Sequence, residues 1–348
     1  MQIIKADYQF ITEESITKKI ERIARICYKS EDKITEGTDI KMITNLLERQ
    51  HTAMLEHGDV CMEVSETIYN LVEDVIHTIE NNFAEINGSC QVPKKIFLRR
   101  TATVLKDNTI RYIISGNIRA WYEFFLEAAT AGALPIGMYT IVNEQIGNLL
   151  DTTRLPEIGF GVDEDWNFDQ DTAFYRFIKD VSTLTFAERM VHETISILFT
   201  VDRGVTHELV RHRDCSFAQE STRYCNYSLG KYGNQITVIE PCFFAGEGNE
   251  DKYNAWVSAM EDAEMHYFDL MNMKVPAQQA RDVLPTSVKA EIVMTTNLQE
   301  WKHIFNLRAC DSTGPAHPQM KEVMIPAFKE IREKLPFAFK GMLAADER

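Results

Sequence analysis

One short stretch, residues 211–223, holds the residue types best suited to chemistry in this chain. It contains three adjacent side chains that carry or accept a positive charge, then a serine and a further arginine: Arg211, His212, Arg213, Ser221 and Arg223. The planar guanidinium group offers paired, directional donors that match phosphate or the edge of a pyrimidine or flavin ring. A solvated basic turn is the alternative for an isolated Arg-His-Arg, but the spacing to Ser221 and Arg223 favours an anion-binding site.

This stretch resembles the signature of the flavin-dependent thymidylate synthases, in which Arg-His-Arg is followed by seven residues and a Ser, with Arg-Tyr just beyond. The resemblance extends over about residues 1–65 and 190–335. It implies an enzyme that methylates dUMP to dTMP, with 5,10-methylenetetrahydrofolate as carbon donor and NADPH-reduced FAD as hydride source. It also implies a homotetramer whose active sites are shared between subunits.

A second segment, residues 50–57, ends in Glu56-His57. Taken alone, such a pair is more often structural than catalytic. The segment is similar to the His-x-Ser-x-x-Glu-His element of the same family, with Thr52 or Ala53 in place of the usual Ser. The resemblance places His57 near the flavin and the folate or nicotinamide site.

Arg281 begins the sequence Arg-x-x-Leu-Pro that ends at Pro285. An arginine at this position could simply cap a helix end. The sequence also resembles the element of the family whose arginine binds the nucleotide, and we favour that interpretation.

Residues 297–309 form the last matching segment. The resemblance gives Asn297 and His303 flavin contacts, and it makes Arg308 the arginine that stabilises the ionised pyrimidine. The family usually has Gly-Asn-x-Arg-Ala-Trp here, and residues 296–301 depart from that pattern, so we expect the pocket rim to differ. His317 lies in a longer sequence after Arg308 and receives no role.

The resemblance therefore implies one catalytic residue, Arg308, and two sets of binding residues. For the cofactor they are His57, Arg211, His212, Arg213, Gln219, Asn297 and His303. For the substrate they are Glu208, Arg211, Gln219, Glu220, Ser221, Arg223, Arg281 and Arg308. No metal site is expected, because the chain lacks paired zinc ligands.

These assignments make chemical sense together. Methylating C5 of a pyrimidine requires negative charge on the ring to be stabilised, and fixed arginines in a dry site do this by electrostatic preorganisation. Arg223 and Arg281 would hold the nucleotide while Arg308 stabilises the ring. Hydride transfer is chemistry that a reduced flavin supplies.

A covalent mechanism is the alternative, because Cys215 and Cys225 flank the signature. Neither belongs to the reaction of the family, so packing is the favoured role for both. Ser221 could also act as a nucleophile, but no general base is evident, so a hydrogen bond to the nucleotide is favoured.

Composition narrows the class of protein. The chain has 348 residues and a net charge of −15, which argues against general binding of nucleic acid or anionic membranes. No apolar run is long enough to span a bilayer. Its seven cysteines form no Cys-x-x-Cys pair, and the first residues do not resemble a signal peptide. We therefore expect free thiols and a cytoplasmic protein.

The order of the expected helices and strands predicts an α+β fold. The resemblance implies a mixed or antiparallel sheet with flanking helices. The expected helices are 13–28, 39–50, 67–82, 117–130, 173–190, 203–211, 252–273, 276–283, 298–308 and 319–334. The expected strands lie around residues 60–64, 194–201 and 290–295. No Gly-x-Gly-x-x-Gly follows a strand, so a Rossmann fold is unsupported.

We expect a single domain, residues 1–348, with an insertion at about 66–188. The role of this insertion is open. Within it, residues 113–121 faintly resemble 293–301, sharing only an Asn and a Trp (Asn117 and Trp121 in the first copy). Chance is the favoured explanation, and a duplicated flavin-contact element is the alternative.

Two other function classes stay open. The arginine cluster could serve a nucleotide- or RNA-binding protein without catalysis, and bound flavin would argue against that class. The chain could also be a flavoenzyme with another substrate, which a dUMP titration of the flavin spectrum would test.

Overall fold

The computed structural model describes residues 1–13, 15–81, 85–86, 89–90, 97–150, 174–223, 225–230 and 233–348. The chain divides into two compact units. Unit 1 comprises Met1–Thr12, Arg22–Ile34 and Ile195–Arg348, and unit 2 comprises Glu13–Glu21 and Thr35–Thr194. The division falls within helix α1 (Ile16–Tyr28).

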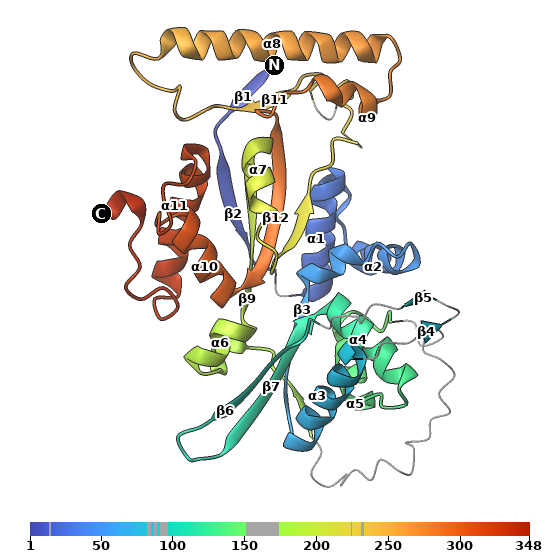
Figure 1. The fold of residues 1–348 in the computed structure, drawn as a ribbon. Helices are drawn as coiled ribbons and strands as arrows, with labels where there is room; N and C mark the ends of the chain where they lie inside the picture. The colour runs from blue at the N-terminus through green and yellow to red at the C-terminus, as the bar shows by residue number, and fades with distance from the viewer. Residues whose placement is uncertain are drawn as a thin grey trace. The chain divides into compact units, whose positions relative to one another are not determined.

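Unit 1 is built on a four-stranded sheet (Figure 1). Its strands, in sheet order, are β10 (Ser216–Gln219), β12 (Lys289–Asn297), β9 (Thr194–Asp202) and β2 (Asp7–Ile11). The pairs β10–β12 and β2–β9 are antiparallel. Strand β12 is buried along most of its length, as its run of apolar and β-branched residues predicts.

Helices cover this sheet and extend the unit. They are α7 (Arg203–Leu209), α8 (Glu250–Asn272), α9 (Ala277–Ala280), α10 (Leu298–Arg308) and α11 (Pro318–Lys334), with 3-10 turns η1 (Glu31–Lys33), η6 (Arg281–Val283) and η7 (Ala345–Glu347). Helices α10 and α11 pack through Phe305 and Phe328, whose ring centroids are 5.5 Å apart. This contact ties α10, which carries Arg308, to the core of the unit.

A smaller parallel pair, β1 (Gln2–Ile4) with β11 (Thr237–Ile239), lies near helix α8 in unit 1 (Figure 1). A separate apolar cluster fills this region and includes Tyr227, Val238 and Tyr267. It anchors the segment that follows the basic stretch.

Unit 2 has its own four-stranded antiparallel sheet. In sheet order its strands are β6 (Arg99–Val104), β7 (Ile110–Asn117), β3 (Asp59–Val64) and β8 (Tyr175–Phe177). Its helices and turns are α2 (Thr38–Glu48), η2 (Thr52–His57), α3 (Glu66–Asn81), α4 (Ile118–Thr130), α5 (Ile136–Gln145), η4 (Val181–Thr183) and α6 (Phe186–His192), and β4 (Glu85–Ile86) pairs with β5 (Ser89–Cys90). Trp121, Phe124 and Phe125 are fully buried in its core.

The predicted mixture of helices and antiparallel sheet is confirmed. The prediction for 298–308 has the bounds of α10, and those for α2, α3, α8 and α11 agree within two residues. The helix predicted at 173–190 is wrong, because strand β8 and the 3-10 turn η4 occupy its first part and the α-helix, α6, begins only at Phe186. A three-residue edge strand is stabilised by its partner strand, which local periodicity does not reveal.

The compact unit that contains the expected insertion is larger than residues 66–188, since it also takes in Thr35–Ser65 and Glu13–Glu21. Among the described residues, no helix combines the length and the apolar character needed to span a lipid bilayer.

Candidate functional site

Arg211, His212 and Arg213 lie in the loop between α7 and β10 of unit 1. Asp202 caps α7 by accepting a hydrogen bond from the backbone N–H of Val205 (2.8 Å). The helix ends at Leu209, two residues before the predicted end at Arg211, and continues as a tighter turn in which the N–H of His212 donates to the carbonyl of Leu209. Arg211 and Arg213 are exposed, so their guanidinium groups face solvent.

Two of the predicted site residues, Glu208 and His212, contact a third, Arg308, at the last turn of α10. Its Nη1 donates to Oε2 of Glu208 over 2.8 Å, and its Nε donates to Nε2 of His212 over 3.2 Å. Glu208 comes from α7 and His212 from the loop that follows. Helix α7, the loop that follows it and helix α10 therefore converge on one arginine.

His212 accepts the hydrogen bond from Arg308, so its ring is neutral with the proton on Nδ1. The side chain is 8% exposed. Burial, with the nearby charges of Arg308 and His303, lowers the pKa of His212 to about 4. At neutral pH the imidazole therefore orients the guanidinium group without repelling it.

The neighbouring strands fix the rest of the loop. Gln219, the last residue of β10, donates through Nε2 to Oγ1 of Thr206 on α7 (3.1 Å). The hydroxyl of Thr296 donates to the carbonyl of Asp214 (2.7 Å). Asn297 caps α10 by accepting from the N–H of Glu300 (2.9 Å), which occupies the oxygen of its side chain.

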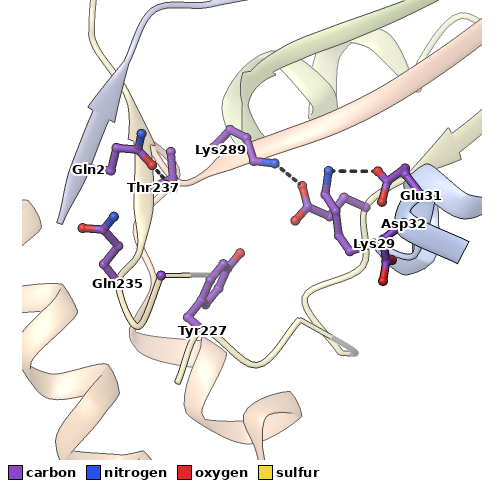
Figure 2. Close-up of a pocket in the computed structure, with 10 residues that line it drawn as sticks. Gln2, Lys29, Glu31, Asp32, Tyr227, Gln235, Thr237 and Lys289 are labelled. Atoms are coloured by element: carbon purple, nitrogen blue, oxygen red, sulfur yellow. Dashed lines mark hydrogen bonds and ion pairs between the residues drawn. The ribbon is translucent and has the colours of Figure 1, made fainter. Parts of the chain in front are cut away.

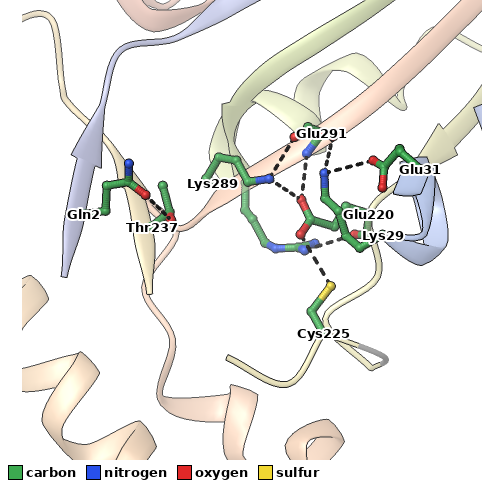
Figure 3. A network of polar contacts seen from close by, with 9 residues as sticks. Gln2, Lys29, Glu31, Glu220, Cys225, Thr237, Lys289 and Glu291 are labelled. Atoms are coloured by element: carbon green, nitrogen blue, oxygen red, sulfur yellow. Dashed lines mark hydrogen bonds and ion pairs between the residues drawn. The ribbon is translucent and has the colours of Figure 1, made fainter. Parts of the chain in front are cut away.

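Glu220 is the centre of a buried ionic network (Figure 3). Its carboxylate is 1% exposed, lies 2.8 Å from Nζ of Lys289 and accepts a bond from Sγ of Cys225. Lys289 also pairs with Glu291 over 3.0 Å, and Glu291 pairs with Lys29. Burial disfavours the charge on Lys289, but the two carboxylates outweigh it and raise its pKa.

The residues just after Glu220 lie next to η6. Arg281 donates through Nη1 to Oγ1 of Thr222 over 3.2 Å, and the hydroxyl of Ser221 accepts from the N–H of Arg223 over 3.4 Å. Arg223 is exposed and Arg281 partly so. Three predicted substrate residues, Ser221, Arg223 and Arg281, thus belong to one local cluster.

A cavity of about 580 Å³ opens beside the ionic network (Figure 2). Its lining comes from unit 1: Gln2, Lys29, Glu31, Asp32, Glu220, Tyr227, Gly233, Gln235, Thr237 and Lys289. Of these the sequence singled out only Glu220. Lys289, which pairs with Glu220, and Lys29 belong to no motif, and the alternation of Lys289 with Glu291 along one strand is the local signal that could have found the network.

The cysteines beside the signature are poorly suited to nucleophilic attack. Burial raises the pKa of Cys215 to about 12, so its thiol is protonated at neutral pH. Cys225 is buried and donates to Glu220. The covalent alternative receives no support from either residue.

His57 is fully buried at the end of η2 in unit 2, whereas Arg211 and His303 belong to unit 1. A pocket that combines the three stays a prediction. His317 is the N-cap residue before α11, and its ring contacts that of Phe243 edge to face. Among the described residues, no group of three or more His, Cys, Asp or Glu side chains could hold a metal ion.

The family model of the thymidylate synthase complementing protein matches residues 160–337, just over half of the chain. The chain belongs to this family. Its curated relatives include the flavin-dependent thymidylate synthases of Pyrococcus abyssi and Pyrococcus furiosus, each 30% identical over 154 residues, which is 43% of this chain and 60% of theirs. The enzyme of Corynebacterium efficiens is 28% identical over 48% of this chain and 68% of its own. The match thus spans about 60% of the length of the two Pyrococcus proteins.

Proposed function

We propose that the protein is a flavin-dependent thymidylate synthase, which converts dUMP to dTMP with 5,10-methylenetetrahydrofolate as carbon donor. The observation that carries the proposal is the convergence of Glu208, His212 and Arg308 within a chain of this family. A guanidinium group fixed from two sides costs little reorganisation when charge develops beside it.

Arg308 is the proposed catalytic residue. Its guanidinium group would stabilise negative charge on the pyrimidine, while Glu208 and the neutral His212 set its orientation. Arg223, Arg281 and Ser221 would hold the nucleotide, since two arginines and a hydroxyl offer several donors to a phosphate. Gln219, Glu220 and Arg211 complete the proposed substrate residues.

The side chains of the basic loop suit a flavin dinucleotide, because exposed Arg211 and Arg213 offer donors to its phosphates. His212, Gln219, Asn297, His303 and His57 are the other proposed cofactor residues. Bound FAD, reduced by NADPH, would supply the hydride that completes the methyl group. A homotetramer with shared sites, a cytoplasmic location and the absence of nucleic-acid or membrane binding belong to the same proposal.

The test is direct. Purified protein should show flavin absorbance, and dUMP should perturb that spectrum. Under anaerobic conditions with NADPH and methylenetetrahydrofolate, mass spectrometry should detect dTMP. Bound flavin that does not respond to dUMP would favour a flavoenzyme with another substrate. Protein that binds neither flavin nor dUMP would refute the proposal.

A further inference from the structure

The same strand-to-helix junction occurs once in each unit. In unit 1, β12 runs into α10 through Asn297, and in unit 2, β7 runs into α4 through Asn117 (Figure 1). Asn297 accepts from the N–H three residues on at 2.9 Å, and Asn117 does so at 2.8 Å. The two caps also share extended backbone angles, with φ and ψ of −79° and 168° against −73° and 161°.

The tryptophan that follows each cap makes the same contacts. The indole of Trp301 donates to the carbonyl of Ile195, on the strand next to β12, over 3.0 Å. The indole of Trp121 donates to the carbonyl of Val60, on the strand next to β7, over 3.2 Å. Each ring stacks on the phenylalanine one turn later, with centroids 5.2 Å apart in unit 1 and 5.7 Å apart in unit 2.

The two sheets share one strand order. The order β10-β12-β9-β2 in unit 1 corresponds to β6-β7-β3-β8 in unit 2. In each, the third strand begins two residues after a buried histidine, His192 before β9 and His57 before β3. This agreement in topology extends the likeness from one junction to the whole sheet.

The outer strands β2 and β8 are also equivalent, but they are exchanged between the units. Strand β2 comes before β3 of unit 2 in the chain and pairs in the sheet of unit 1, whereas β8 comes before β9 of unit 1 and pairs in the sheet of unit 2. Strand β2 lies in unit 1 and reads Tyr-Gln-Phe-Ile from Tyr8, while β8 lies in unit 2 and begins the sequence Tyr-Arg-Phe-Ile at Tyr175. Phe10 pairs with Ile197, the fourth residue of β9, and Phe177 pairs with Met62, the fourth residue of β3. Matching sequence at matching register makes coincidence a poor explanation.

The alignment of the two units shows where they differ. Arg308 stands eleven residues after its capping Asn, and the residue eleven after Asn117 is Ala128, which is fully buried. Arg99 on β6 lies opposite Ser115, and Ser216 on β10 lies opposite Thr295, where Ser115 and Thr295 each stand two residues before the capping Asn. Arg99 therefore corresponds to Ser216, and five residues further along the chain Val104 of unit 2 corresponds to Ser221 of unit 1. Unit 2 thus has apolar residues where unit 1 has two of the proposed dUMP residues.

The arginines that unit 2 does carry on its sheet are paired internally. Arg99 pairs with Asp59, Arg100 lies 2.6 Å from Glu73, and Arg111 lies 3.1 Å from Glu188. Arg99, Arg100 and Arg111 are all of the arginines on strands β6 and β7. Each of these three arginines therefore has a carboxylate partner within unit 2.

A histidine further closes the sheet of unit 2. Nδ1 of His192 lies 2.8 Å from Oγ of Ser115 on β7, and its Nε2 lies 2.8 Å from Oγ1 of Thr101 on β6. Both ring nitrogens are therefore engaged by hydroxyl groups of adjacent strands. The side chain is 2% exposed, so this bridge belongs to the interior.

We infer that unit 2 is a second copy of the fold of unit 1 that does not bind the nucleotide, so that each chain binds one dUMP although it contains the fold twice. The family match at residues 160–337 contains β9, β10 and β12, three of the four strands in the sheet of unit 1, together with β8 of unit 2. Helix α8, strand β11 and helix α9 belong to unit 1 and are the elements that it has in addition to the shared fold. The inference rests on the proposed function, because dUMP is the ligand that distinguishes the copies.

The experiment counts dUMP sites on the flavin-loaded chain by isothermal titration calorimetry. We expect one dUMP per chain, and a loss of affinity of about tenfold or more in Arg281→Ala, since that arginine belongs to unit 1. Arg100→Gln is the matched control in unit 2 and should bind dUMP as the unaltered protein does. Circular dichroism confirms that each variant is folded.

Two dUMP per chain would overturn the inference and leave the proposed function intact. One site of unaltered affinity in Arg281→Ala, combined with weakened binding in Arg100→Gln, would place the nucleotide in unit 2 and also overturn it. A folded, flavin-loaded chain that binds no dUMP would refute the proposed function, and this inference with it.

Discussion

The two units use the same framework for different ends. In both, an Asn cap, a buried Trp and a stacked Phe fix one helix against one sheet. In unit 1 that helix carries Arg308 to a partly exposed cluster with Glu208 and His212. In unit 2 the corresponding position is the buried Ala128. The packing residues maintain the fold, and a few side chains on it decide whether chemistry is available.

The buried ion pairs of the two units also differ in what they support. In unit 1, Lys289 and Lys29 hold Glu220 and Glu291 directly before the segment proposed to bind dUMP. In unit 2, Arg99 and Asp59 join two strands that carry no proposed site residue. Disrupting the first network should therefore affect stability and binding, whereas disrupting the second should affect stability alone.

The largest expected effect follows from Lys289→Met, which leaves Glu220 buried without its closest cation. Breaking such a pair costs about 3–5 kcal/mol of the free energy of unfolding. Urea denaturation measures this loss, and calorimetry should show weaker dUMP binding as well. Arg99→Met is the matched variant in unit 2, and its dUMP affinity should not change. Equal effects of both variants on binding would contradict the division of roles.

Arg308→Ala should abolish dTMP formation while flavin stays bound. Removing one preorganised donor costs on the order of 2–4 kcal/mol of barrier, which is roughly a thirtyfold to a thousandfold loss in rate. Single-turnover assays with prereduced flavin measure the chemical step. Arg111→Gln in unit 2 is the control and should retain the rate. Turnover of Arg308→Ala near that of the unaltered protein would remove the basis for the catalytic assignment.

The sequence predicted the local features of the molecule and missed those that depend on contacts between distant residues. Arg211, His212, Arg213 and α10 were predictable because a signature and a helical repeat are local features. The pairing of Lys29 with Glu291 spans 262 residues and leaves no local trace. The likeness of 113–121 to 293–301 looked like chance because only an Asn and a Trp agree. Those two residues are the ones whose cap and indole hydrogen bonds the fold requires.

Acid should destabilise both units through their buried histidines. Burial and Arg99 lower the pKa of His192 to about 3, and burial with Arg308 and His303 lowers that of His212 to about 4. The unfolded chain binds these protons near pH 6.5, so stability is complete above that pH and falls as the pH decreases toward the folded values. Between pH 6.5 and 5, each histidine should cost about 2 kcal/mol.

Urea denaturation at several pH values tests this titration. His192→Gln should flatten the pH dependence without altering dUMP binding at neutral pH. His212→Leu should flatten it too and also slow dTMP formation, because a leucine side chain cannot accept the hydrogen bond that Arg308 donates to His212. A pH dependence that is unchanged in both variants would show that neither histidine is held neutral.

The tryptophans offer a test of equivalence that needs no ligand. Trp121→Phe and Trp301→Phe each remove an indole donor and leave a buried strand carbonyl without it. An unsatisfied buried group costs about 1–3 kcal/mol, and we expect losses of similar size in the two variants. Thermal unfolding measures both. A strong effect at Trp301 with none at Trp121 would argue that the two junctions are not the same structure.

The smallest expected effect concerns the thiols. Burial raises the pKa of Cys215 in unit 1 and of Cys61 in unit 2 to about 12. Their shared burial indicates that the thiol beside the signature is a packing group, as the Cys61 thiol is in unit 2. Cys215→Ala should therefore keep the rate of dTMP formation within about twofold, since a shift of that size corresponds to less than 1 kcal/mol. Cys61→Ala is the control for loss of packing. If Cys215→Ala is folded and binds flavin but forms no dTMP, while Cys61→Ala is active, the reaction requires a thiolate and the arginine mechanism is insufficient.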